Sequence, residues 1–139
     1  MSSSNKLDLQ DKDTCFVCGR SNPSGLRLPI VADDQGAHFE YVIPEHYQGW
    51  HGIAHGGIVA TLLDELMAWS TKTRGYSTVT AEMNVRFRKP VPVGRKIYGQ
   101  GWITAEQGRL VLAASRLTDP AGTVLAEATG KLWKVSERH

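Results

Sequence analysis

The sequence predicts an α+β domain in which a mainly antiparallel sheet wraps around one long helix. One helical pattern, over residues 56–74, carries apolar residues around about half of a helical wheel. Two strand-like segments precede this pattern and four follow it. The 139 residues are enough for one hydrophobic core and too few for two, so we expect a single domain over residues 14–139, after a disordered polar tail over residues 1–13.

The two strands before the helix are expected at residues 25–31 and 37–43. In the second, every other residue is apolar, which is typical of a half-buried strand. A turn over residues 33–36 separates the two strands, and Pro44 ends the second. The loop over residues 45–54, rich in glycine, histidine and aromatic residues, then leads to the helix.

The helix has two unlike halves. Its apolar half contains Ile58, Val59, Leu62, Leu63, Leu66, Met67 and Trp69. Its other half contains Ala60, Thr61, Asp64, Ala68 and Thr71. Gly75 is placed to stop the helix at its carboxyl end.

Four strands are expected after the helix, at residues 78–88, 96–106, 109–118 and 123–135. The first of these alternates cleanly. One face is expected to carry Val79, Ala81, Met83, Val85 and Phe87. The other face is expected to carry Thr80, Glu82, Asn84, Arg86 and Arg88.

Composition excludes several classes of protein. With 41% hydrophobic and 22% charged residues and a net charge of +2, nucleic acid is not an expected partner. No apolar run is long enough to span a membrane, and the first residues lack the apolar core of a signal peptide, so we expect a cytoplasmic protein with no membrane partner. The absence of a glycine-rich nucleotide loop predicts no ATP or NAD cofactor.

Two glycines open the helix, in the sequence His55-Gly56-Gly57. They leave backbone N–H groups unshielded at the positive end of the helix dipole, which suits an anion or a carbonyl oxygen that becomes an oxyanion. A tight, closely packed loop without a ligand is the alternative interpretation of these three residues.

Asp64 lies among small residues, which favour close approach to another surface; a solvated surface carboxylate is the alternative. Gly56 and Asp64 are eight residues apart, or roughly 12 Å along a helix. An oxyanion donor and a base must both reach the same group, at about 3 Å. Two antiparallel copies of the helix satisfy this requirement, which predicts a homodimer with shared sites. Glu65, at the edge of the apolar half, is expected to be a rim or ion-pair residue.

The run from His55 to Glu65 resembles the central helix motif of hotdog-fold thioesterases. The most similar type is that of the phenylacetate pathway, a relative of 4-hydroxybenzoyl-CoA thioesterases. The resemblance continues through residues 80–90 and Gly94 and covers about residues 25–135. It implies a hotdog fold and hydrolysis of acyl-CoA thioesters to free acid and CoA. It also implies dimers that can pair into tetramers.

The same resemblance implies roles for individual residues. The Gly56 amide, in the His-Gly-Gly motif with His55 and Gly57, would polarise the thioester carbonyl. Asp64 of the partner subunit would act as nucleophile or as general base. Gln48 is the candidate for a loop amide that places substrate or water, and Thr80 is the candidate for an assisting hydroxyl.

Candidates for substrate binding both precede and follow the helix in the sequence. Five basic residues without an intervening acid, Arg86, Arg88, Lys89, Arg95 and Lys96, would suit the phosphates of CoA or would form an ordinary solvated strand edge. Tyr47 and Trp50, in the loop before the helix, are candidates for the wall of an acyl pocket.

Cys15 and Cys18 form a single CxxC pair in a segment that resembles the N-terminal segment of a subset of hotdog thioesterase-like proteins. We expect structural thiols and no metal. Zinc and redox roles stay open, but zinc would require histidine ligands or a second subunit.

Two other functions stay open. A non-catalytic hotdog protein that binds acyl groups or other small ligands would bind acyl-CoA without releasing thiol, and a thioesterase for carrier-protein-bound acyl groups would act on a protein substrate. Acyl chain length and aromatic preference are not determined by the sequence.

Overall fold

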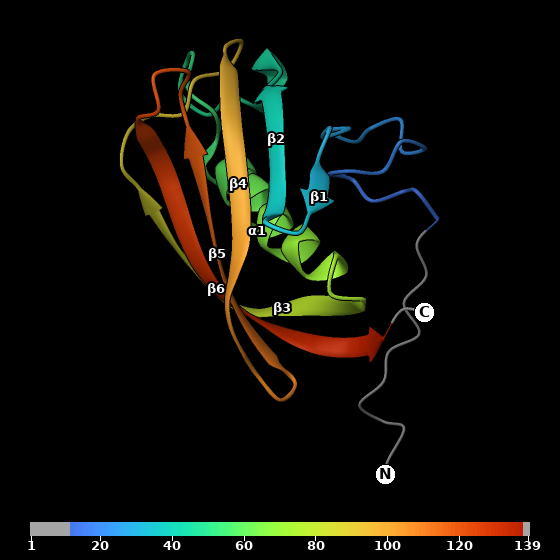
Figure 1. Ribbon diagram of the computed structural model, residues 1–139. Coiled ribbons are helices and arrows are strands. Elements are labelled where there is room, and N and C mark those ends of the chain that lie inside the picture. Colours follow the sequence, from blue (N-terminus) through green and yellow to red (C-terminus); the bar gives the residue numbers. More distant parts are fainter. Residues whose placement is uncertain (1–11, 138–139) are drawn as a thin grey trace.

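The computed structural model describes residues 12–137, as a six-stranded antiparallel sheet wrapped around one long helix. Figure 1 shows the curved sheet holding the helix α1 against its concave face. The strand order is β1-β2-β4-β5-β6-β3. The elements are β1 (Val31–Asp33), β2 (Gly36–Val42), the 3₁₀ helix η2 (Glu45–Tyr47), α1 (Gly56–Lys72), β3 (Tyr76–Phe87), β4 (Lys96–Gln107), β5 (Leu110–Thr118) and β6 (Val124–Glu137). The predicted α+β architecture is confirmed.

Five of the six expected strands, and the helix, begin and end within two residues of their predicted bounds. The prediction of a strand over residues 25–31 is wrong, because regular β-sheet pairing begins only at Val31. Pro29 has no N–H to donate to a ladder, and Arg27 has a positive φ of 52°. Leu26 and Leu28 instead donate their backbone N–H groups to Phe16 and Val17 of the preceding loop.

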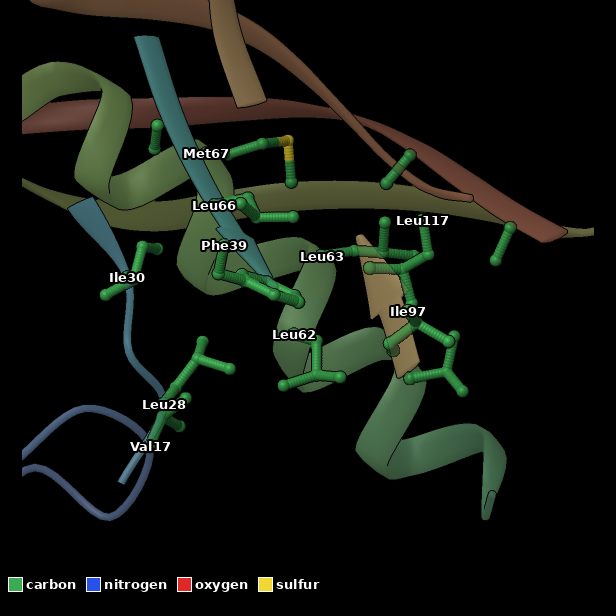
Figure 2. Close-up of a cluster of buried hydrophobic side chains, with 14 of the residues drawn as sticks. Val17, Leu28, Ile30, Phe39, Leu62, Leu63, Leu66, Met67, Ile97 and Leu117 are labelled. Atoms are coloured by element: carbon green, nitrogen blue, oxygen red, sulfur yellow. The ribbon is translucent and has the colours of Figure 1, made fainter. Parts of the chain in front are cut away.

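The core lies between α1 and the sheet. Leu62, Leu63, Leu66 and Met67 of α1 are fully buried. Figure 2 shows their side chains among those of the strands and of the N-terminal loop, with Phe39, Ile97, Leu117, Val17, Leu28 and Ile30. Thr71 departs from the expected helix pattern: it is buried, and its hydroxyl oxygen lies 3.2 Å from that of Thr78.

The strand β3 contains a bulge that changes which residues face α1. Thr80 pairs with Leu132, but Glu82 pairs with Lys131, so Ala81 is an extra residue in the ladder. The expected clean alternation is therefore wrong: Thr80 shares the helix-facing side with Met83 instead of facing away with Glu82. The other edge of β3 has no paired strand among the described residues, and β3 is twelve residues long.

The tail expected over residues 1–13 lies outside the described residues, except for its last two. Within residues 12–137, no helix is long and apolar enough to cross a lipid bilayer.

Candidate active site

The start of α1 presents one free backbone donor. His55 is the N-cap, and its Nδ1 accepts a hydrogen bond from the Gly57 N–H at 2.9 Å. An accepting Nδ1 requires the neutral tautomer with its proton on Nε2. The Gly57 N–H is thus already used, whereas the Gly56 N–H has no acceptor among residues 12–137. Of the two glycine amides predicted to bind the substrate, only that of Gly56 is free to do so.

A cleft of about 370 Å³ opens beside Gly56. Trp50 and Phe87 border it, and both are exposed, at 83% and 57%. A Cβ placed on Gly56 would lie 3.7 Å from the ring of Phe87, so the free amide lies next to an aromatic wall. An apolar cleft with one backbone donor suits an acyl group whose carbonyl must be polarised.

Asp64 is half-buried in the middle of α1 and is hydrogen-bonded to β3. The Thr80 hydroxyl donates to Asp64 Oδ1 across 2.5 Å. The structure thus brings together the predicted carboxylate and the predicted hydroxyl. The bulge at Ala81 makes this contact possible, because it turns Thr80 toward the helix.

Asp64 and Thr80 do not line the cleft at Gly56. Eight helical residues separate Gly56 from Asp64, or about 12 Å. Within one chain the free amide and the carboxylate therefore lie too far apart to contact the same reacting atom. Both lie along β3, the strand with the free edge, because Phe87 approaches Gly56 and Thr80 approaches Asp64.

Of the three candidates in the loop before α1, only one borders the cleft. Gln48 accepts a hydrogen bond from the Gly52 N–H at 2.9 Å, so its side-chain amide braces the loop. Tyr47 is half-buried, with its ring centroid 4.2 Å from that of His46, and it does not line the cleft. Of the three candidates, Trp50 alone borders the cleft, and together with Ala54 it also borders the adjoining hollow at His55.

The five predicted basic residues separate in space. Arg88 and Lys89 border the cleft, and Arg88 also forms an ion pair with Glu127 at 2.9 Å. Arg86 lines a different hollow of about 340 Å³, which also includes Trp102 and Arg116. Arg95 is exposed, and Lys96 forms an ion pair with Glu40 at 3.6 Å.

The sequence does not predict two contacts of the structure, one at the site and one away from it. Alternation predicts only that Phe87 lies on an apolar strand face, whereas its position at the end of β3 places it beside the helix start. Glu65 was expected at a rim or in an ion pair, but it accepts a hydrogen bond from Trp69 and lies with Cys15 and Cys18 in a group able to hold a metal ion. Burial, together with Glu65, raises the pKa of the Cys18 thiol.

Comparisons with known proteins identify the family of the chain. A family model described as the thioesterase superfamily matches residues 51–126, which include the start of α1, Asp64 and β3. The acyl-coenzyme A thioesterase THEM4 of Bos taurus is 29% identical over 118 residues, which make up 73% of this chain and 48% of the bovine protein. This chain spans between 39% and 63% of the length of the curated relatives it matches.

Solved structures share the fold. A Streptococcus mutans UA159 protein, smu.793, whose structure was determined with acetyl CoA bound, has a TM-score of 0.73 and 19% identity, over 81% of this chain and 91% of that one. The E. coli PaaI protein from the phenylacetic acid degradation operon has a TM-score of 0.72 and 18% identity, over 78% of this chain and 83% of that one.

Proposed function

Because the chain belongs to the thioesterase superfamily, we propose that it hydrolyses acyl-coenzyme A thioesters to a free acid and coenzyme A. The observation that carries the proposal is the free N–H of Gly56, at the start of α1, because Gly56 lines an apolar cleft. Relatives that match two thirds or more of this chain are named acyl-coenzyme A thioesterases, which supports the same substrate class.

The working unit in this proposal is a homodimer, paired through the free edge of β3. A long exposed strand edge is an open template for pairing with another chain. A two-fold axis beside β3 would run two copies of α1 antiparallel, so that Gly56 of one subunit meets Asp64 of the partner subunit. Two such sites form in each dimer. Such dimers can pair further into tetramers in this proposal.

In the proposed reaction the Gly56 N–H binds the thioester oxygen and stabilises the negative charge that develops there. Asp64 of the partner subunit removes a proton from a water molecule, whose oxygen attacks the carbonyl carbon. The C–S bond then breaks, and CoA leaves as a thiolate that takes up a proton. Direct attack by Asp64, with a mixed anhydride that water then hydrolyses, is the other route with the same residues.

Cleft residues supply recognition in this proposal. Trp50 and Phe87 favour aromatic or other flat apolar acyl groups, in keeping with the phenylacetate-pathway type that the helix motif resembles. Lys89 and Arg88, at the edge of the cleft, would attract the CoA phosphates. The Lys89→Ala substitution should therefore raise KM for acyl-CoA but not for thioesters that lack phosphate, and Arg95→Ala, in the same basic run but outside the cleft lining, is the matched control.

The first test is the Asp64→Asn variant with a panel of aromatic and aliphatic acyl-CoAs and a thiol reagent. We expect kcat to fall at least about 100-fold while the circular dichroism spectrum and the elution volume stay unchanged. Undiminished turnover would exclude Asp64 as the catalytic group. Binding of acyl-CoA by the wild type without thiol release would indicate a binding protein, and release from acyl-carrier protein alone would indicate a carrier-protein thioesterase.

The second test asks whether two subunits share each site. Asp64→Asn and Gly56→Pro chains, each inactive as homodimers, are combined with different affinity tags and the mixed dimer is isolated. One of its two sites then has an intact Gly56 and an intact Asp64, so about half of the wild-type activity should return. If each site lay within a single chain, the mixed dimer would stay inactive.

A further inference from the structure

A group of three possible metal ligands lies away from the Gly56 cleft. Cys15 and Cys18 come from the loop before β1, and Glu65 comes from α1. One ligand atom from each lies within 4.8 Å of the other two. We propose that Cys15, Cys18 and Glu65 form a zinc site that fastens the N-terminal loop to the central helix.

The donor atoms match zinc. Glu65 supplies the further ligand that the sequence alone would assign to a histidine or to a second subunit. Two thiolates and one carboxylate are among the ligands that Zn²⁺ takes, at about 2.3 Å for sulfur and about 2.0–2.2 Å for oxygen. Ligands on a tetrahedral zinc with these bond lengths lie about 3.6–3.8 Å from one another. The present spacing exceeds that by about 1 Å at most, which rotation of side chains and a small shift of the loop can supply.

The charges also match a divalent cation. Cys15 Sγ lies 3.8 Å from Glu65 Oε2, and the thiol donates to this carboxylate. Two thiols and one carboxylate carry a net charge of −1. When Zn²⁺ displaces both thiol protons, two thiolates, one carboxylate and the cation again sum to −1, so binding adds no net charge to this partly exposed cluster.

A second layer of contacts holds Glu65 in place. Trp69, one turn further along α1, donates its indole N–H to Glu65 Oε2 at 3.2 Å. Donors of this kind fix the orientation of ligating carboxylates in metal sites. Trp69 belongs to the apolar half of the helix, and its indole N–H adds a polar contact with Glu65.

The loop that carries the two cysteines is anchored before any metal binds. Val17, between them, is 3% exposed, and its side chain points into the core beside Leu28 (Figure 2). Gly19 follows the second cysteine, and its N–H donates to the Cys15 carbonyl at 2.8 Å. A Cβ on Gly19 would lie 2.4 Å from the Cys15 backbone nitrogen, so only glycine fits this turn.

Three protein ligands leave one position of a tetrahedral zinc for water. Cys15 is exposed, so solvent reaches the cluster and could supply that water. Asp64 and Glu65 are neighbours in sequence but contact different elements, since Asp64 accepts from Thr80 of β3 and Glu65 from Cys15 of the loop. The zinc site is therefore expected to stabilise the fold without taking part in the hydrolysis.

The test measures metal directly and does not depend on activity. The full-length reduced protein is loaded with zinc sulfate, passed through a desalting column and analysed by atomic emission. We expect one zinc per chain in the wild type, and loss of it in Cys18→Ser. An exposed acid outside the cluster provides the matched control, Glu45→Gln, which should keep its zinc. Wild-type protein that retains no more zinc than Cys18→Ser would overturn the proposal.

Cobalt provides a spectroscopic test of the ligands. Co²⁺ at the site should give thiolate-to-metal absorption in the near ultraviolet, and this band should weaken in Cys15→Ser. Trp69→Phe keeps all three ligands but removes the donor to Glu65, so it should bind Co²⁺ on the order of tenfold more weakly with the same band. A cobalt spectrum without thiolate absorption, or a Cys15–Cys18 disulfide that persists in reducing buffer, would contradict the zinc site.

Discussion

Thr80 donates a hydrogen bond to Asp64 across 2.5 Å, from a strand position that simple alternation assigns to the opposite face of the sheet. The β-bulge at Ala81 resolves the difference, because one extra residue reverses the side on which the preceding side chains point. Thr80 contacts the carboxylate and not the cleft at Gly56, so it is a positioning residue for the proposed reaction.

Removal of the Thr80 hydroxyl should lower kcat more than it raises KM. The Thr80→Val variant keeps the β-branched shape but loses the donor, and a hydrogen bond to a charged group contributes about 1.5–3 kcal/mol, or roughly 10–100-fold in rate. Thr80→Ser, which keeps the hydroxyl, should restore most of kcat. Steady-state kinetics with one acyl-CoA checks this, and equal activity of the Val and Ser variants would remove Thr80 from the mechanism.

The Gly56 N–H can be removed without disturbing the helix. Gly56 is the first helical residue, where proline is tolerated, and His55 before it has the extended backbone that proline requires (ψ 137°). Gly56→Pro should therefore fold normally and lose at least about 100-fold in kcat. Gly56→Ala keeps the N–H, and its Cβ meets Phe87 at an ordinary 3.7 Å, so it should retain more activity than Gly56→Pro. The reverse order would contradict the role of the amide.

Substitution of Gly57, unlike that of Gly56, should lower the free energy of unfolding. A Cβ there would lie 3.1 Å from His55 Nδ1, which caps the helix. Gly57→Ala should displace the imidazole and cost about 1 kcal/mol, the typical value of an N-cap. Urea unfolding measures this loss. His55→Ala should have a similar cost, and the double variant should be little worse than either single one, because both remove the same cap.

Much of this architecture follows from the sequence because its signals are local. The apolar half of the helix predicts α1, and alternation predicts five strands of the sheet. The strand over residues 25–31 fails because Pro29 and Arg27 disrupt a pattern that hydrophobicity alone makes attractive. The Cys15–Glu65 contact could not be predicted, since it depends on how a loop folds against a helix fifty residues away.

The close packing of β4 against α1 likewise depends on contacts between distant parts of the sequence and could not be predicted. Gly101 is buried, and a Cβ on it would lie 2.5 Å from the backbone oxygen of Leu66. Gly101→Ala should therefore destabilise the fold by about 1–3 kcal/mol or more, because a helix backbone cannot yield as a side chain can. Gln100→Ala, on the exposed neighbour, removes only surface hydrogen bonds from Arg116, so it is the control and should cost about 1 kcal/mol at most. Equal urea midpoints for the two variants would contradict this close packing.

Acid should weaken the contact between β3 and β4 at Tyr76 and Glu106. The Tyr76 hydroxyl donates to Glu106 Oε1 at 2.5 Å, and this hydrogen bond, with Lys134 and Arg74 nearby, lowers the pKa of Glu106 below its ordinary 4.5. A lowered pKa in the folded state means that the contribution to stability is complete above pH 4.5 and is lost as the pH falls through the folded value.

A double-mutant cycle of Tyr76→Phe and Glu106→Gln isolates this contribution. Because about a third of the Glu106 side chain is exposed, we expect a coupling energy of only about 1 kcal/mol at pH 7. The coupling should decrease steadily below pH 4.5, since a protonated Glu106 no longer accepts a charge-assisted hydrogen bond. Urea unfolding of the four proteins at several pH values measures it, and a coupling energy that stays constant down to pH 2 would show that the carboxylate charge contributes nothing to this contact.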